Sequence, residues 1–307
     1  MTRVAGIDCG TNSIRLLVAD LADGGLVDVH REMRVVRLGE GVDRTGRLAP
    51  QAIERTRAAL ADYAATISRF GAERVRMVAT SASRDASNAE EFRAMVRATL
   101  GADPEVISGL AEAELSFTGA VAGLPGVAAG ELLVADLGGG STELVLGSPA
   151  RRTVRAAHSM DVGCVRMTER HLRAEPPTGQ QIEATLADLR VALARAAEDV
   201  PVREAAGFVG VAGTVTTIAA LALKLPAYDP AAIHGSVLSY DTVAEVTAML
   251  LASTHAERAA LPVMHPGRVD VIGGGALVLR TVMEFVGAAE VIVSEHDILD
   301  GIALSLA

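Results

Sequence analysis

The sequence contains no tryptophan, few other aromatic residues and only two cysteines. Aromatic residues make up 3% of the 307 residues, whereas hydrophobic residues make up 50%. We therefore expect a core of Ala, Val and Leu, a composition that suits buried strands flanked by helices. The two cysteines, Cys9 and Cys164, provide no disulfide framework and show no metal-ligand spacing, so we expect each to be a small buried residue.

The sequence also lacks long apolar runs and an excess of positive charge. No run reaches membrane-spanning length, and the start, residues 1–4, has no apolar signal segment. We therefore expect a soluble, cytoplasmic protein without a membrane partner. The formal net charge of −10 argues against a broad nucleic-acid surface. A polyanionic substrate is still compatible with it, because a cleft with a metal ion and a few arginines can be locally positive.

The most informative stretch is LLVADLGGGSTELVLG, residues 132–147. An apolar strand ends at Asp136, three glycines follow, and a second apolar strand begins after Glu143. Glycines let backbone amides approach an oxyanion, and successive amides in such a turn form an anion-binding nest. Carboxylates beside a phosphate would repel it unless a divalent cation lies between them. The alternative interpretation is a tight glycine hairpin with two surface acids.

Two further stretches resemble this one. Near the N-terminus a strand ends at Asp8 and leads through a turn of small and hydroxyl-bearing residues, 10–13, into a second apolar run. A repeated strand, Asp, turn and strand suggests two similar domains that face each other across a phosphate. In the third candidate, residues 210–217, a strand enters a Gly-Thr turn and then an Ala-rich helix.

Other charged residues allow two interpretations each. Arg84 follows the apolar strand 75–79, and ligands bind at the carboxyl ends of strands in open α/β sheets. Its forked donors suit a phosphate, but a surface arginine near Asp85 fits equally well. Glu112 lies in the first turn of a helix that begins near Ala111, where carboxylates usually interact with the helix dipole. A lone histidine such as His234 is more often structural than catalytic.

Local signals also predict the main elements. We expect three strands within residues 4–36, with a hairpin at Gly24-Gly25, and a helix between Pro50 and the stop at Gly71. Asn88 with Glu91 predicts a capping box. The remaining expectations are a long helix capped by Thr178, a close helix contact or ligand contact at Gly273–Gly275, a domain boundary within 123–130, and a closing helix over 297–306.

The motifs taken together resemble the exopolyphosphatase/guanosine-pentaphosphate phosphohydrolase family, within the actin-like ATPase superfamily. The likeness spans nearly the whole chain, and its most specific marks are the DLGGGSTE unit at 136–143 and the SGLAEA segment at 108–113. It implies an α/β fold of two ribonuclease H-like domains around an interdomain cleft. The domains expected are residues 1–124 and 125–307, with the helix at about 297–307 a candidate to pack back on the first.

The resemblance also assigns site residues. By similarity, Glu112 occupies the position of the catalytic glutamate that activates the attacking water, whereas Glu114 falls where the family commonly has a basic residue. Asp136 and Glu143 match carboxylates that hold Mg²⁺ (or Mn²⁺), with Asp8 a candidate to contribute through water. The phosphate contacts implied are Thr11, Asn12, Ser13, Arg84, Gly138, Gly139, Gly140, Ser141, Gly213, Thr214 and Thr216.

The chain looks like the short, two-domain actinobacterial form, since longer members append a helical C-terminal domain that extends the polyphosphate channel. Residues 294–301, SEHDILDG, depart from the commoner family ending and fit that subgroup. We expect hydrolysis of terminal phosphoanhydride bonds in short-chain polyphosphate, or alternatively in guanosine pentaphosphate. A kinase of the same superfamily and a non-catalytic sensor of polyphosphate or guanosine penta- or tetraphosphate are the competing hypotheses. The likeness also implies a homodimer.

Overall fold

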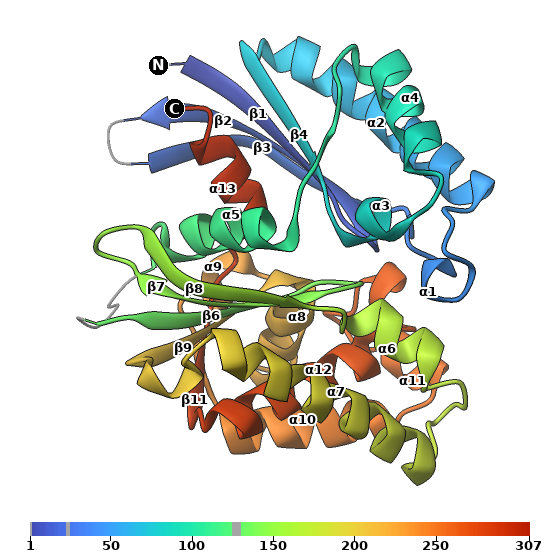
Figure 1. Ribbon diagram of the computed structural model, residues 1–307, viewed down its shortest axis with the longest axis vertical. Coiled ribbons are helices and arrows are strands. Elements are labelled where there is room, and N and C mark those ends of the chain that lie inside the picture. The colour runs from blue at the N-terminus through green and yellow to red at the C-terminus, as the bar shows by residue number, and fades with distance from the viewer. Residues whose placement is uncertain (1, 23–24, 125–129) are drawn as a thin grey trace. The chain divides into compact units, whose positions relative to one another are not determined.

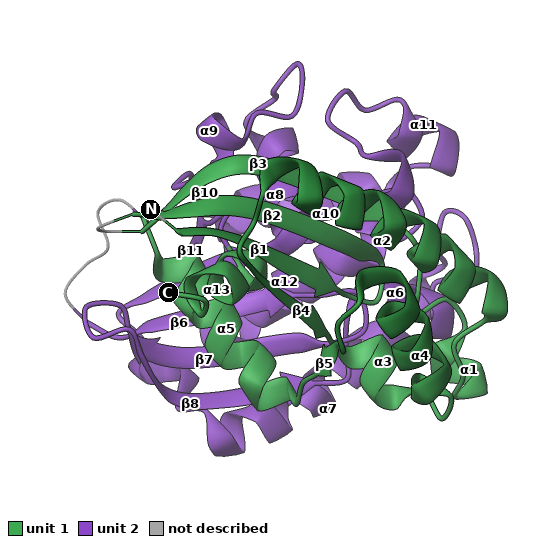
Figure 2. Ribbon diagram, turned by 90° about the horizontal axis from the view of Figure 1, so that it is seen from above, with its two compact units in different colours: residues 1–123, 297–307 green, residues 124–296 purple. Residues whose placement is uncertain are grey.

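The computed structural model describes residues 2–22, 25–124 and 130–307, which divide into two compact units (Figure 2). Unit 1 consists of Met1–Gly123 and Asp297–Ala307, and unit 2 of Leu124–His296. Each unit is built on one mixed sheet with helices, which confirms the predicted α/β class. The Gly24-Gly25 hairpin and the predicted boundary at 123–130 fall partly outside the described residues.

Unit 1 contains a five-stranded sheet in the order β3-β2-β1-β4-β5. The first strand, β1, pairs antiparallel with β2 and parallel with β4, so the carboxyl ends of β1 and β4 meet at one edge. The elements of unit 1 are β1 (Thr2–Cys9), β2 (Ser13–Ala22), β3 (Gly25–Val35), α1 (Val42–Thr45), α2 (Pro50–Phe70), β4 (Arg74–Ala79), α3 (Ser81–Asp85), α4 (Ala89–Leu100), β5 (Glu105–Val106), α5 (Gly109–Val121) and α13 (Ile298–Leu304).

The two faces of the unit 1 sheet pack against different helices. Figure 1 shows α2 and α4 on one side of this sheet and α5 and α13 on the other. Ala5, Ile7 and Cys9 belong to the apolar cluster formed with α2 and α4, whereas Val4 belongs to the cluster formed with α13. Because successive side chains of a strand point to opposite faces, Asp8 lies on the same face as Val4, toward α13.

Local chemistry accounts for the start and end of α2. Pro50 is the first helical residue, where its missing N–H costs nothing. Gly71 ends the helix at φ 68°, and its N–H donates to the carbonyls of Ile67 and Ser68. Thr178 likewise forms a capping box with Gln181 at the start of α7, as predicted.

The capping box predicted at Asn88 is wrong. Asn88 precedes α4, but its side chain makes no cap hydrogen bond. The amide instead bonds both backbone groups of Leu48, accepting from its N–H at 2.8 Å and donating to its carbonyl at 3.1 Å. A buried backbone segment competes successfully for the same side chain, because leaving that segment without partners costs more than an uncapped helix turn.

Unit 2 contains a six-stranded sheet in the order β10-β11-β9-β6-β7-β8. Its main apolar cluster joins the sheet to α6, α7, α8, α10 and α12. The elements of unit 2 are β6 (Leu132–Leu137), β7 (Thr142–Ser148), β8 (Thr153–Met160), α6 (Cys164–Arg170), α7 (Gly179–Asp199), η1 (Val202–Glu204), β9 (Gly207–Val211), α8 (Ala212–Ala222), α9 (Pro230–Ile233), β10 (Val237–Ser239), α10 (Tyr240–Ala252), α11 (His255–Ala259), η2 (Pro266–Arg268), α12 (Ile272–Val286) and β11 (Glu290–Val293).

The Gly273–Gly275 run lies in the first turn of α12 and permits close helix packing. A Cβ on Gly275 would lie 2.5 Å from Thr214 Oγ1 of α8, and one on Gly274 would lie 3.1 Å from the Cys164 carbonyl of α6. The run thus serves a helix–helix contact, one of the two uses predicted for it.

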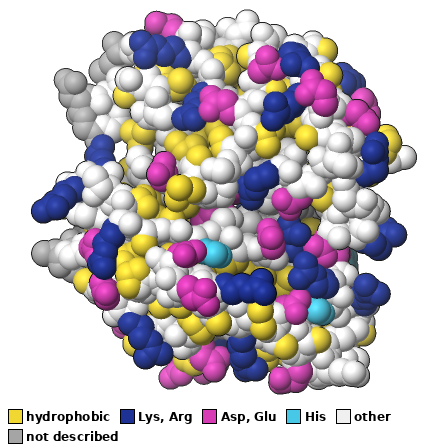
Figure 3. Space-filling model, in the orientation of Figure 1, with side chains coloured by type: hydrophobic (Ala, Val, Ile, Leu, Met, Phe, Trp, Pro, Cys, Tyr) yellow, Lys and Arg dark blue, Asp and Glu magenta, His cyan; other side chains and the backbone are white. Residues whose placement is uncertain are grey.

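The helices and the visible surface charge can be compared with the expectations on hydropathy and charge. Within residues 2–22, 25–124 and 130–307, no helix combines the length and apolar character needed to cross a bilayer. On the face shown in Figure 3, basic and acidic side chains are interspersed.

Candidate functional site

The carbonyl groups of the glycine turn in unit 2 are all held by α6. The Gly138 carbonyl accepts from the Cys164 N–H at 3.1 Å, and the Gly139 carbonyl accepts from the Val165 N–H at 2.9 Å. Arg166 donates its Nε to the Gly140 carbonyl at 2.7 Å. Because the C=O and N–H of a trans peptide point in opposite directions, the next three N–H groups point away from α6. This orientation builds a row of N–H donors suited to an oxyanion.

Glycines on both sides of this contact allow a close approach of the backbone. A Cβ on Gly163, just before α6, would lie 2.5 Å from the Gly139 carbonyl oxygen, and one on Gly138 would lie 3.0 Å from the Ser141 carbonyl oxygen. Nothing in the sequence around Arg166 indicated that it holds the turn, because the contact joins segments that pattern analysis treats separately.

Asp136 and Glu143 are direct cross-strand partners in the β6–β7 pair. They are 6% and 1% exposed, and Ser159 donates to Glu143 Oε1 at 2.7 Å. Directly opposed side chains have Cβ atoms about 4.5–5.5 Å apart, and like charges there are destabilising. Two buried carboxylates so placed favour a cation near them, which is the donor chemistry that Mg²⁺ prefers.

No complete metal cage accompanies this pair. Over the part of the chain that the structure describes, no group of three or more His, Cys, Asp or Glu side chains could hold a metal ion. Mg²⁺ commonly keeps several waters and is bound by one or two carboxylates plus substrate phosphates. The Asp136–Glu143 pair therefore fits a metal that is shared with a phosphate ligand.

The third predicted turn, Gly213–Thr216, is not a loop. It forms part of the first turn of α8, which begins directly after β9. Val211 is the strand partner of Asp136, so the start of α8 and the end of β6 lie at the same edge of the sheet. Ala212 has φ 72°, a left-handed conformation that costs a non-glycine residue about 1–2 kcal/mol. The N-terminus of α8 offers N–H groups and a favourable dipole to an anion.

Arg268 is a candidate site residue that the sequence analysis missed. Its guanidinium lies on the backbone of Gly213, where a Cβ would come within 2.7 Å of Nε, and its Nη1 donates to Thr217 Oγ1 at 3.1 Å. It adds a positive charge to the first turn of α8. The only sequence signal was Gly213 itself, whose missing Cβ leaves space that the arginine occupies.

The hydroxyl of Thr216 is engaged within unit 2. Tyr228 Oη lies 2.7 Å from Thr216 Oγ1 and 2.6 Å from Glu295 Oε1. One phenol proton cannot serve both, and an ionised carboxylate only accepts, so Thr216 donates to Tyr228. The Thr216 N–H is the fifth of α8 and belongs to the helical ladder, so the site residues of this turn whose N–H groups have no intrahelical partner are Gly213 and Thr214.

Unit 1 brings its candidate residues to one edge of its own sheet. Cys9 pairs with Ala79, so the turn after β1 and the segment after β4 are neighbours, and Thr11 Oγ1 lies 2.8 Å from Ser81 Oγ. The carbonyls of Thr11 and Asn12 accept from the N–H groups of Gly39 (2.8 Å) and Val36 (3.0 Å). As in unit 2, this orients the following N–H groups the opposite way.

Arg84 and Glu112 form an ion pair at this edge. Arg84 Nη1 lies 3.1 Å from Glu112 Oε2 and donates to the Ile107 carbonyl at 3.0 Å. Glu112 is 8% exposed in the first turn of α5, whose N-cap Ser108 accepts from the Ala111 N–H. A first-turn carboxylate that was only a dipole partner would ordinarily be exposed, whereas Glu112 is buried beside an arginine.

Asp8 lies at the end of β1 and accepts two hydrogen bonds from Arg15. Arg15 Nε and Nη2 donate to Asp8 Oδ2 at 2.9 and 2.7 Å, and Nη1 donates to Asp297. Burial raises the pKa of Asp8, and the Arg15 charge opposes this. Burial lowers the pKa of Arg15, but Asp297 and Asp8 outweigh it and raise that pKa well above its usual value.

Both cysteines are buried, and burial raises the pKa of each thiol. Since the thiolate is the reactive form, little of it is present at pH 8. We expect neither Cys9 nor Cys164 to react with a disulfide reagent such as dithionitrobenzoate in the native protein, and both to react in denaturant. Rapid labelling of Cys9 in the native protein would contradict this burial.

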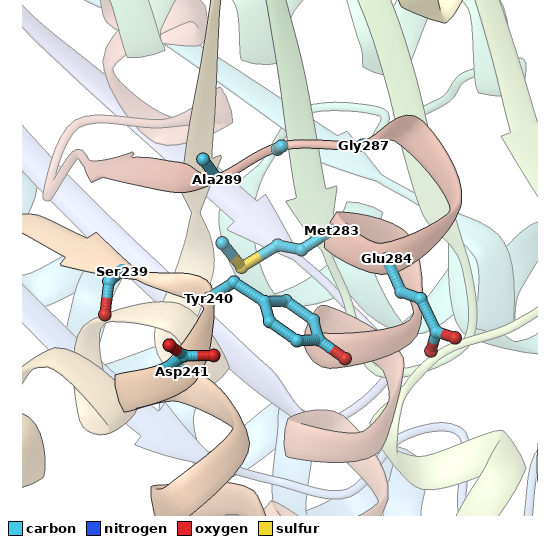
Figure 4. A pocket seen from close by; sticks show the side chains of 8 residues that line it. Ser239, Tyr240, Asp241, Met283, Glu284, Gly287 and Ala289 are labelled. Carbon is cyan, nitrogen blue, oxygen red and sulfur yellow. The ribbon is translucent and has the colours of Figure 1, made fainter.

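A described pocket in unit 2 contains none of the predicted site residues. It has a volume of about 440 Å³ and lies at the start of α10, the end of α12 and the segment before β11 (Figure 4). Tyr240 and Met283 lie side by side in it, and its charged lining residues are Asp241 and Glu284. Two acids without a basic residue make it a poor site for a polyanion.

Comparison with known proteins supplies the family. Residues 17–307 match the model of the Ppx/GppA phosphatase family. The chain belongs to this family. It is similar to exopolyphosphatase 2 of Mycobacterium tuberculosis, with 55% identity over 100% of this chain and 99% of the relative.

Solved structures of the family share its fold. An exopolyphosphatase-like protein superposes with a TM-score of 0.95 at 43% identity and covers 100% of this chain and 98% of the other. A Ppx/GppA family member of Aquifex aeolicus superposes with a TM-score of 0.83 at 34% identity, covering 99% and 97%. The resemblance stated from the motifs is thus confirmed.

Proposed function

We propose that this protein hydrolyses terminal phosphoanhydride bonds of inorganic polyphosphate and releases orthophosphate. The observation that carries the proposal is the glycine turn of unit 2, whose N–H groups are aimed by α6 beside the buried Asp136–Glu143 pair. Membership of the family supports a phosphatase. Identity of 55% along the full length to a protein named exopolyphosphatase 2 supports polyphosphate as substrate.

The residues have separate roles in this proposal. In unit 2 the amides of Gly139, Gly140 and Ser141 bind the terminal phosphate, and the first turn of α8 adds further donors. In unit 1 the candidate phosphate contact is the turn at Thr11–Ser13. Asp136 and Glu143 would hold Mg²⁺ or Mn²⁺, which when bound would neutralise phosphate charge. Most of the rate enhancement then comes from positioning and electrostatic stabilisation.

Glu112 is proposed as the base that orients the attacking water and accepts its proton. Its partner Arg84 lies 3.1 Å away and has a second anchor in the Ile107 carbonyl. A guanidinium held in this way can remain in place while its other N–H groups bind a phosphate oxygen. Arg84 thereby stabilises the negative charge that develops on the phosphate and fixes the direction of the Glu112 carboxylate.

Several expectations from the family likeness are retained as proposals. These are the division into two actin-like domains, the homodimer, the cytoplasmic location and a function connected with guanosine pentaphosphate. The homodimer can be tested by light scattering of the purified protein at several concentrations. A mass of one chain at every concentration would reject it.

The deciding experiment measures orthophosphate release without any acceptor, from short polyphosphate, long polyphosphate and guanosine pentaphosphate. We expect release that is fastest from short polyphosphate, is abolished by a chelator and returns when Mg²⁺ is added in excess. Faster release from guanosine pentaphosphate would change the substrate assignment. Substrate binding without release would support a sensor, and release that depends on an added acceptor would support a kinase.

A further inference from the structure

Arg15 joins two carboxylates that lie far apart in the sequence. On one side it donates twice to Asp8 Oδ2, and on the other it donates to Asp297 Oδ2. Asp8 is 4% exposed and Asp297 is 2% exposed. The register of the β1–β2 pair places Arg15 directly opposite Asp8, so the Arg15 guanidinium reaches the Asp8 carboxylate from ordinary strand geometry.

Asp297 is itself held in one orientation. It is the N-cap of α13, and its Oδ1 accepts from the Leu299 N–H at 3.0 Å. Its own N–H donates to Asp300 Oδ2 at 3.0 Å, which completes a capping box. One oxygen of Asp297 therefore serves the helix, and the other receives Arg15.

The position of α13 is fixed by backbone contact with α5. Cβ atoms on Gly119 and Gly301 would each overlap the main chain of the opposite helix, the first coming within 2.8 Å of the Gly301 nitrogen and the second within 2.7 Å of the Leu115 carbonyl carbon. Figure 1 shows α13 beside α5 and over β1 and β2, although it ends the chain. Helices in such contact cannot slide without steric overlap.

We propose that Arg15 and Asp297 are positioning residues that hold Asp8 with one carboxylate oxygen, Oδ1, available to a hydrated metal ion; the inference rests on the proposed function. Asp8 Oδ2 is occupied by Arg15, whereas the buried Oδ1 has no hydrogen-bond partner among the described residues. A buried acceptor without a partner is costly unless a ligand satisfies it.

Charge counting supports the same conclusion. Arg15 is shared between Asp8 and Asp297, whereas Arg31 is shared between Asp300 and the exposed Asp28. When both are ionised, the two buried carboxylates Asp8 and Asp297 are therefore balanced by Arg15 alone, and one negative charge remains beside it. The oxygen best placed to meet a cation is Asp8 Oδ1, since the structure gives the remaining oxygens of Asp8, Asp297 and Asp300 hydrogen-bond donors.

The same helix provides a matched control. Asp300 is also 2% exposed and also binds an arginine, with Arg31 Nη2 at 2.5 Å from its Oδ1, but that arginine does not contact Asp8. If Asp297 only anchored α13, then weakening the Asp300–Arg31 pair would have the same effect as weakening the Asp297–Arg15 pair. If Asp297 positions Asp8, only weakening the Asp297–Arg15 pair affects metal binding.

The experiment compares Asp297→Asn with Arg31→Lys in the full chain, because Arg31→Lys weakens the Asp300–Arg31 pair and leaves the Asp300 carboxylate in the capping box of α13. Asparagine is as good an N-cap as aspartate, so Asp297→Asn keeps the helix start while it removes the charge that holds Arg15. Mn²⁺ binding is measured by the loss of the free-ion electron paramagnetic resonance signal, with inorganic pyrophosphate present and a protein-free sample of Mn²⁺ and pyrophosphate as the reference. Mg²⁺ activation of orthophosphate release and thermal unfolding are measured on the same samples, and Arg15→Lys replaces Asp297→Asn if the latter does not fold.

We expect Asp297→Asn to weaken Mn²⁺ binding and to raise the Mg²⁺ concentration for half activation by about 10-fold or more. Effects of this size are usual when a residue that orients a metal ligand is changed. Arg31→Lys should change neither, even if both variants melt at the same lower temperature. Equal effects of the two variants, or unchanged Mn²⁺ binding in Asp297→Asn, would overturn the proposal. A wild-type protein that releases no orthophosphate would overturn the proposed function, while a selective loss of Mn²⁺ binding would still support positioning.

Discussion

Replacement of Glu112 by glutamine is expected to lower the rate of orthophosphate release by about 10²–10⁴-fold, the usual contribution of a general base. Glutamine has nearly the same shape and can still receive Arg84, but it cannot take a proton from water. Because the change removes one function and little volume, we expect kcat to fall while KM for polyphosphate changes little. Steady-state kinetics at saturating Mg²⁺ measure both constants.

Glu114→Gln is the control for this substitution. Glu114 lies on the same helix, two residues further along, and is exposed, with its main-chain carbonyl accepting from Thr118. The variant should retain the activity of the parent. If Glu112→Gln also retained it, Glu112 would be a structural partner of Arg84, and the base would have to be sought elsewhere.

Replacement of Gly301 by alanine is expected to destabilise the protein by about 3 kcal/mol or more, at the upper end of overpacking effects. The new Cβ would overlap the Leu115 carbonyl at the crossing of α5 and α13. Alanine is favoured over glycine in a helix by about 1 kcal/mol, so the steric term must exceed that gain. Urea unfolding followed by circular dichroism measures the change.

Gly179→Ala gives the matched comparison. Gly179 is the first residue of α7, and a Cβ there would meet no atom within 4 Å. This variant should change the free energy of unfolding by about 0.5 kcal/mol or less. A Gly301→Ala variant as stable as Gly179→Ala would mean that α13 can withdraw from α5 at little cost.

Much of the fold follows from short-range signals in the sequence. Pro50 and Gly71 delimit α2, and Thr178 starts α7, because these residues act through their immediate backbone neighbours. The prediction at Asn88 failed because its side chain bonds Leu48, forty positions earlier. Gly213 was expected in a turn and lies inside a helix, since the helix starts at the strained Ala212 directly after β9.

In the candidate site, too, the residues in short motifs could be predicted from the sequence and the contacts between distant segments could not. Its glycine turns and Asp136 with Glu143 were recognisable because each lies in a compact motif. Glu112 by itself indicated only a helix-dipole partner, and its catalytic role came from the family likeness. The groups that hold them, namely Arg166 on the glycine turn, Arg268 on α8 and Asp297 beside Arg15, are side chains joined across long sequence separations. Pairing of this kind leaves no periodicity or spacing in a single sequence. The roles of all these residues remain predictions until they are tested.

The return of the last helix to the first unit imposes an order on folding during synthesis. Unit 2 is one continuous segment, Leu124–His296, whereas unit 1 is interrupted by it. Domains generally fold as units while the chain emerges from the ribosome. Unit 2 can therefore complete its core first. Until α13 has been synthesised, residues 1–123 lack the helix that covers Arg15 and one face of β1. Nascent chains released before that point would expose this face, and chaperones that bind apolar surface would be expected to recognise it.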